Sequence, residues 1–289
     1  MYLGRQMPHD TTTGRTKGGP LLRWAGSKRK LIPQLCQRVP ENAQRYIEPF
    51  AGSACLFFHL LPKSAVLGDA NPELIKTYRV VRDQPIELAE ALARMPRTEQ
   101  FYYDLRARAP RELDRVERAA RFVYLNRFCF NGVYRTNRQG QFNVPRGVRT
   151  GAVPTADNIK SASSALRRAK LIAGDFESCL ESIEPGDFVY LDPPYAKRGR
   201  PGYGEYGYDV FCEDDLERLI KSLQSIDSRG GTFLLSYSYS LRTRELFRDW
   251  HCRTLLVRRH VAGFGRHRGL VREVLVTNAT DAGREHPPQ

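Results

Sequence analysis

The hydrophobic residues of this chain form short, β-prone runs that alternate with longer segments of helical spacing. Strands are predicted where short apolar runs occur, at 46–47, 65–67, 169–172, 188–191, 232–236, 253–260 and 273–277. Helical spacing predicts helices within 55–61, 85–121, 158–168 and 214–226. Because strands that alternate with helices favour a parallel sheet covered on both faces, we expect an α/β, doubly wound, Rossmann-like fold.

The first predicted strand enters a helix through the small-residue turn Glu48-Pro49-Phe50-Ala51-Gly52-Ser53-Ala54. A pyrophosphate needs several glycines in such a turn, whereas this one has only Gly52 and opens with an acidic residue. Asp69 ends the second strand 19 residues after Phe50, near the spacing of about 20 at which an acidic side chain binds ribose hydroxyls. A phosphate-free adenosine with a cationic sulfonium, S-adenosylmethionine, fits both features. Taken alone, Asp69 could equally cap the following helix.

The strand at 188–191 leads into Asp192-Pro193-Pro194-Tyr195. Two prolines fix their own φ angles, so the carboxylate, the next carbonyl and the aromatic ring lie on a stiff corner. The Asp192 carboxylate and the Pro193 carbonyl could accept both hydrogens of an amino group on a flat base, while Tyr195 stacks on that base. An ordinary Asp-Pro turn is the alternative, because short motifs often occur by chance.

A basic and aromatic segment runs from Asn126 to Arg146. It contains the turn signals Asn131-Gly132 and Gln139-Gly140 and no Asp or Glu. Guanidiniums suit phosphates and guanine edges, and aromatic rings suit stacked bases, so we predict a nucleic-acid-binding loop or hairpin. A basic hairpin without function is the alternative.

Two further loops are expected to flank the site. The segment 202–207 matches Gly-x-Gly-x-x-Gly by letter, but it follows the Pro-Pro corner rather than a strand-to-helix turn. We interpret it as a mobile lid and not as a dinucleotide site. The basic loop 263–268 is expected to contact phosphate.

Composition narrows the class of protein. The net charge of +14, from 46 Lys and Arg against 32 Asp and Glu, favours a nucleic-acid partner. The six cysteines are scattered without a Cys-x-x-Cys pair, and the six histidines show no ligand spacing, so we predict no metal and no disulfide framework. With no targeting or membrane segment predicted, we expect a cytoplasmic protein, associated with a nucleoid or encoded by a phage.

Taken together, these segments resemble the Dam-type (alpha-class) DNA adenine-N6 methyltransferases, from about Leu21 to Asn278. The order of motifs is that of the family, with cofactor motifs first, recognition next and catalysis last. The segments that carry the resemblance are Arg23-Trp24-Ala25-Gly26-Ser27-Lys28, Glu48-Pro49-Phe50-Ala51-Gly52-Ser53-Ala54, Gly68-Asp69-Ala70-Asn71, 126–145, Asp192-Pro193-Pro194-Tyr195 and Glu273-Val274-Leu275-Val276-Thr277-Asn278. Ala54 departs from the family, which usually has a second glycine there.

The resemblance implies methyl transfer from S-adenosylmethionine to the amino group of an adenine flipped out of double-stranded DNA. The catalytic residues it implies are Asp192, Pro193 and Tyr195. The cofactor-binding residues we predict are Trp24, Lys28, Phe50, Gly52, Asp69, Asp175, Phe176 and Asp192.

The resemblance also implies roles in DNA recognition. Phe130 would lie beside the flipped base and Asn131 would meet the orphaned thymine, while Arg135 and Arg23 would contact the outer base pairs. Two arginines around an A·T core favour a short palindrome with G·C at both ends, and we predict GATC. The remaining predicted DNA contacts are Val133, Asn137 and Pro145.

The expected organisation is a Rossmann-like methyltransferase domain interrupted by a mainly helical target-recognition domain that carries a hairpin. The domain boundaries predicted are 1–18 for a disordered tail, 19–84 and 157–279 for the catalytic domain, 85–156 for the recognition domain and 280–289 for a second tail. We expect a monomer or weak dimer. The same chemistry on RNA, or on another amino or amide substrate, is the alternative function.

Overall fold

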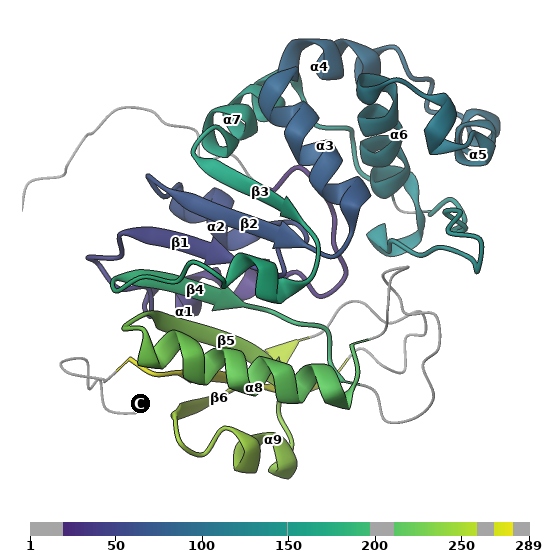
Figure 1. The fold of residues 1–289 in the computed structure, drawn as a ribbon. Coiled ribbons are helices and arrows are strands. Elements are labelled where there is room, and N and C mark those ends of the chain that lie inside the picture. Colours follow the sequence, from purple (N-terminus) through teal and green to yellow (C-terminus); the bar gives the residue numbers. More distant parts are fainter. Residues whose placement is uncertain (1–19, 149, 197–210, 259–268, 280–289) are drawn as a thin grey trace, which may run out of the picture.

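The computed structural model describes residues 20–148, 150–196, 211–258 and 269–279 (Figure 1). Its centre is a seven-stranded sheet with the order β3-β2-β1-β4-β5-β7-β6. β1 to β5 pair in parallel, and β7 runs antiparallel to both β5 and β6. The strands are β1 (Arg45–Glu48), β2 (Ala65–Asp69), β3 (Ala169–Ala173), β4 (Asp187–Leu191), β5 (Thr232–Ser238), β6 (His251–Arg258) and β7 (Leu270–Thr277).

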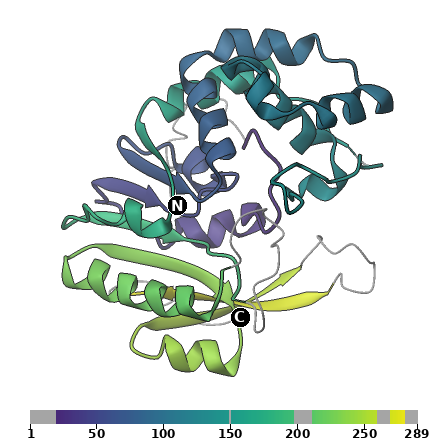
Figure 2. The ribbon, with the colours of Figure 1, turned by 45° about the vertical axis from the view of Figure 1, so that its right-hand side comes forward.

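Helices cover both faces of this sheet (Figures 1 and 2). One face packs against α8 and η4, and the other against α2, α3 and α7. The helices are η1 (Arg29–Leu31), α1 (Ile32–Cys36), α2 (Cys55–Leu60), α3 (Pro72–Asp83), α4 (Pro85–Ala93), α5 (Glu99–Ala107), η2 (Pro110–Glu112), α6 (Arg115–Phe128), η3 (Phe130–Gly132), α7 (Ala156–Leu166), η4 (Phe176–Cys179), α8 (Glu213–Ser228) and α9 (Leu241–Leu246).

Burial on both faces explains why the central strands read as continuous apolar runs. Successive side chains of a strand point to opposite faces, so Phe188 and Tyr190 enter the core beneath α2 and α3, whereas Val189 and Leu191 enter the core beneath α8. All five residues of β4 are buried. The predicted α/β fold with a Rossmann-like sheet is therefore confirmed.

The helices α4 to α6 follow α3 and precede α7 in the chain, and they lie at one end of the molecule (Figure 1). An Asp114–Glu117 capping box begins α6, and the ion pair of Arg118 with Glu73 ties α6 to α3. Their apolar residues belong to the same hydrophobic cluster as α2, α3 and one face of the sheet. These helices occupy the span predicted for the recognition domain, and the division into domains stays a prediction.

The structure corrects two predictions in this region. The helical stretch 85–121 is several helices, broken near Pro96 and Pro110, and its last helix continues to Phe128. Asn126, predicted in the recognition loop, therefore lies in the last turn of α6. Its polar side chain is buried because it bonds the backbone of Arg23 in both directions, with distances of 2.8 and 2.6 Å.

The predicted hairpin is a loop held by two isolated antiparallel bridges, Cys129 with Arg146 and Thr136 with Phe142. Sequence patterns also gave no sign of the short helix α9. The predicted lid at 202–207, the basic loop at 263–268 and both tails lie outside the described residues. Within the described ranges, no helix is long and apolar enough to cross a membrane.

Candidate active site at the carboxyl edge of the sheet

Three acidic side chains gather where β1, β2 and β4 end. Parallel strands end at the same edge of a sheet, so Glu48, Asp69 and Asp192 are brought together although they are far apart in sequence. Burial raises the pKa of Glu48 well above its ordinary range, and the charges of Asp192 and Asp69 raise it further, against the opposing hydrogen bond from Tyr46. Burial also raises the pKa of Asp69 to about 6. This edge is a site where a cation is electrostatically favoured.

Lys28 supplies a cation at this edge. Its Nζ donates to Asp192 Oδ1 at 2.7 Å and to the Gly26 carbonyl at 3.2 Å, and only 7% of the lysine is exposed. Burial alone would lower the pKa of Lys28, but electrostatic attraction to Asp192, Tyr195 and Glu273 together raises it above its ordinary value. The ammonium therefore stays charged and holds one carboxylate oxygen in place.

Contacts from β5 and β7 hold the Pro-Pro corner. The Tyr195 hydroxyl donates to Glu273 Oε1 at 3.2 Å, and the Tyr195 ring meets the Tyr237 ring edge-on at 5.3 Å. The Ala196 amide donates to the Tyr237 hydroxyl at 2.8 Å. The corner is thus fastened on both sides of the aromatic ring that was predicted to stack on a base.

The Gly52 turn is built around Trp24. Gly52 has φ +46°, and a Cβ there would lie 2.6 Å from Trp24 Cδ1, so the indole packs where any other side chain would be. Asp69 Oδ2 accepts from the Gly52 amide and Oδ1 from the Asn71 amide, each at 2.9 Å. The alternative that Asp69 caps α3 is wrong, because Asn71 is the cap and accepts from two amides of the first turn.

Ala54 closes the same turn in the left-handed region, with φ +48°, and it is fully buried. This conformation explains why a glycine suits the position. The alanine adopts it here directly before α2.

The structure also brings Phe50 and Phe176 together, with ring centroids 5.3 Å apart. The Arg218 guanidinium lies over the Phe176 ring at 4.9 Å. Asp175 caps η4 through the Glu177 amide and pairs with Arg218 at 2.6 Å. The predicted cofactor residue Asp175 is therefore already neutralised by an arginine of α8.

The predicted DNA contacts lie on the loop after α6 and on the segment before α1. Phe130 is 42% exposed, and Asn131 has φ +54°. A Cβ at Gly132 would lie 2.5 Å from Arg23 Cβ, so this turn packs directly on Arg23. Trp24 stacks on Tyr134 with centroids 6.2 Å apart. Residues 23 and 24 thus join the loop after α6 to the Gly52 turn.

The remaining loop residues differ in their exposure and in the hydrogen bonds that they make. Arg135 is exposed and its Nε donates to Asn143 Oδ1 at 2.9 Å, while Val133 is half-buried and Pro145 exposed. Asn137 holds the turn, because its Oδ1 accepts from two backbone amides and its Nδ2 donates to Gln141. A base contact by Asn137 would require those bonds to break.

Sequence analysis missed two buried hydroxyl groups beside Asp192. Ser236 Oγ donates to Asp192 Oδ1 at 2.9 Å and lies 3.3 Å from the Tyr190 hydroxyl. Ser236 sits in an apolar strand, and only the pairing of β4 with β5 brings it to the carboxylate.

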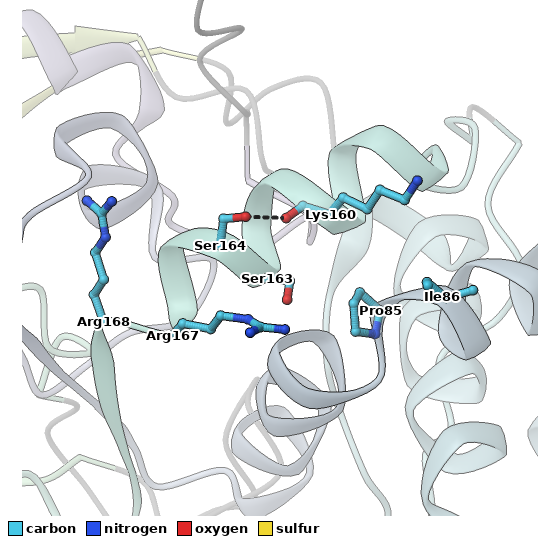
Figure 3. A pocket seen from close by; sticks show the side chains of 7 residues that line it. All are labelled: Pro85, Ile86, Lys160, Ser163, Ser164, Arg167 and Arg168. Carbon is cyan, nitrogen blue, oxygen red and sulfur yellow. Dashed lines mark hydrogen bonds between the residues drawn. The ribbon is translucent and has the colours of Figure 1, made fainter.

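A separate hollow of about 480 Å³ lies between α4 and α7 (Figure 3). Arg168 directly precedes β3, so this hollow is at the amino edge of the sheet, opposite the site. In Figure 3 the Lys160 and Arg168 side chains extend away from each other. Across the described residues, no three His, Cys, Asp or Glu side chains cluster as metal ligands.

The protein has an α/β fold, and its seven-stranded mixed sheet resembles the Rossmann-like sheet of methyltransferases. The chain belongs to the D12 class of N6 adenine-specific DNA methyltransferases, which it matches over residues 24–261. It is a site-specific DNA adenine-N6 methyltransferase, as the resemblance predicted.

Relatives agree with this membership. The type II methyltransferase M1.LlaDCHI of Lactococcus lactis subsp. cremoris is 37% identical over 90% of this chain and 95% of its own. The type II methyltransferase M.MjaIII of Methanocaldococcus jannaschii is 34% identical over 77% of this chain and 85% of its own. The DNA adenine methylase of Escherichia coli K12 is 28% identical over 90% of this chain and 95% of its own.

Substitution of Gly52 tests how the turn is built. Gly52→Ala should cost about 1–2 kcal/mol for the left-handed backbone and a further ~1–3 kcal/mol for displacing Trp24, and it should shift tryptophan fluorescence. Gly140→Ala is the matched control, because Gly140 has φ +73° with nothing within 4 Å of the added Cβ. Urea unfolding measures both; equal losses for the two variants would contradict the packing described.

Proposed function

We propose that the protein moves a methyl group from S-adenosylmethionine to the exocyclic amino group of an adenine flipped out of duplex DNA, within GATC. One observation carries the proposal: the Asp192 carboxylate, paired with Lys28, lies at the same sheet edge as the Gly52 turn and Asp69. This arrangement puts a candidate amino-group acceptor beside a candidate adenosine site.

The cofactor supplies an electrophilic methyl group on a sulfonium cation. The residues at this edge fit such a group, because a nearby cation would stabilise the ionised forms of Glu48 and Asp69, whose pKa values are raised. The turn also lacks a second glycine and any phosphate-binding charge. In the proposal Asp69 accepts from ribose hydroxyls and Gly52 allows close backbone approach. The other proposed cofactor contacts are Trp24, Lys28, Phe50, Asp175 and Phe176.

Asp192 and Pro193 prepare the amino group in this proposal. Both bonds that Asp192 makes with described residues fall on Oδ1, so Oδ2 is available to accept one amino hydrogen, and the Pro193 carbonyl accepts the other. The nitrogen lone pair is then directed at the methyl group by orientation and fixed dipoles. Tyr195 stacks on the flipped base, which offsets part of the cost of unstacking.

Recognition of GATC is assigned to the loop after α6. Phe130 is exposed enough to fill the space beside a flipped base, and Asn131 follows it on a sharp turn toward the orphaned thymine. Arg135 and Arg23 read the outer guanines in this proposal, because guanidinium pairs bidentately with a guanine edge. Val133 and Pro145 provide apolar contact with thymine methyl groups. Arg135 must first leave Asn143.

Asp192→Ala should abolish methyl transfer, because the lost carboxylate acts on the amino hydrogens. The protein should stay folded but be less stable, because the Lys28 ammonium loses its counterion. Transfer of radiolabel from S-adenosylmethionine to duplex DNA, with RNA and protein in parallel, measures the activity. Asp214→Ala, an exposed acid in the first turn of α8, is the control and should keep full activity. Near-native turnover by the Asp192 variant would refute its catalytic role.

The raised pKa of Asp69 predicts a pH dependence of cofactor binding. The carboxyl keeps its proton until the pH exceeds about 6, and the ionised form is the better acceptor for ribose hydroxyls. Affinity for S-adenosylmethionine should therefore fall about tenfold from pH 7 to pH 5, and Asp69→Asn should bind more weakly with a flatter profile. Calorimetric titration across this range decides it; identical profiles for both proteins would exclude Asp69 from the cofactor site.

Arg135→Ala should relax sequence selection. Loss of a bidentate arginine should cost about 1–3 kcal/mol of discrimination at an outer base pair, so methylated adenines should spread to sites altered at that pair. Arg138→Ala, an exposed arginine of the same loop, should weaken binding to all sequences alike. Sequencing of methylated adenines in cells that express each variant separates the two. Methylation by the unsubstituted protein at sites without a GATC core would overturn the GATC assignment.

A further inference from the structure

The two hydrogen bonds of the Asp192 carboxylate with described residues fall on the same oxygen. Lys28 Nζ reaches Oδ1 from the segment before α1, and Ser236 Oγ reaches it from the neighbouring strand β5. A carboxylate rotates about its Cβ–Cγ bond in a broad, twofold manner, so it needs such contacts to present one chosen oxygen. Its orientation is therefore set by these two donors.

The two donors differ in stiffness. Lys28 is a long side chain on a loop, whereas Ser236 is a short one on a strand that pairs with β4 up to Leu191 and Leu235. Ser236 is fully buried, so its hydroxyl does not exchange this partner for water. The strand pairing thus fixes the position of the serine oxygen relative to Asp192.

The Tyr190 hydroxyl orients Ser236 in turn. A serine hydroxyl has one hydrogen, and here it is donated to Asp192. The 3.3 Å contact with Tyr190 must then be a bond that the phenol donates and the serine accepts. Tyr190 is 1% exposed, and burial followed by the charge of Asp192 raises its pKa well above its ordinary value, so it remains a donor.

We propose that Ser236, oriented by Tyr190, is a positioning residue that turns Asp192 so that Oδ2 faces the amino group to be methylated. This inference rests on the proposed role of Asp192 and goes beyond it. Without the serine, the carboxylate is held by Lys28 alone and can rotate until the ammonium contacts both oxygens. The ammonium and the amino group then compete for Oδ2, and a smaller fraction of bound adenines is correctly oriented for methyl transfer.

Single-turnover methylation with saturating cofactor and duplex DNA tests this chain of hydrogen bonds from Tyr190 through Ser236 to Asp192. Ser236→Ala should slow the methylation step about 10- to 100-fold, as expected for a small misplacement of a reacting group, with unchanged cofactor affinity. Tyr190→Phe should slow it less, and the double variant should be no slower than Ser236→Ala because both act through one chain of bonds. If Ser236→Ala does not fold, the methylation rate of Tyr190→Phe still tests this chain of hydrogen bonds.

Ser163→Ala is the matched control. Ser163 is equally a buried serine, and it donates to the Arg82 carbonyl at 2.8 Å far from the site. It should lower the unfolding temperature at most slightly and leave the rate unchanged, which separates lost packing from lost positioning.

Three outcomes would overturn the proposal. Ser236→Ala within twofold of the native rate, while Asp192→Ala is inactive, would refute the positioning role alone. A slowed rate that follows a loss of cofactor affinity or of folded protein would assign Ser236 a structural role instead. An active Asp192→Ala protein would refute the catalytic role of Asp192, and the positioning proposal with it.

Discussion

The ion pair between the buried Lys28 and the half-buried Asp192 is the interaction on which this site depends. Parallel strands end at one edge, and that topology forces acidic side chains together in surroundings where burial makes their charges costly. A single ammonium, 7% exposed, compensates one of them. Removing Asp192 would leave the buried Lys28 ammonium without its counterion, which is the expensive case for such pairs.

The segment that carries Lys28 also joins the parts of the molecule. Within a few residues it bonds α6 through Arg23, covers Gly52 with Trp24, stacks on the recognition loop at Tyr134 and reaches Asp192. The loop after α6 and the edge that holds Asp192 are therefore connected through two or three directly packed residues.

Sequence patterns predicted those features that depend on local order. The strands were predictable because burial on both faces leaves continuous apolar runs, and the corner at Asp192 because two prolines restrict it wherever it lies. Asn126 was misplaced in a loop because its polar side chain is satisfied by Arg23, 103 residues away. Ser236 could not be found, because its contact with Asp192 exists only once β5 pairs with β4 in a given register.

The most direct test is a crystal structure of the protein with duplex GATC DNA and a non-reactive analogue of S-adenosylmethionine. The account predicts an adenine outside the stack, with its amino nitrogen within hydrogen-bond distance of Asp192 Oδ2 and the Pro193 carbonyl. It also predicts that Ser236 remains on Oδ1. An amino group bound to Oδ1, or an adenine that lies away from Asp192, would contradict it.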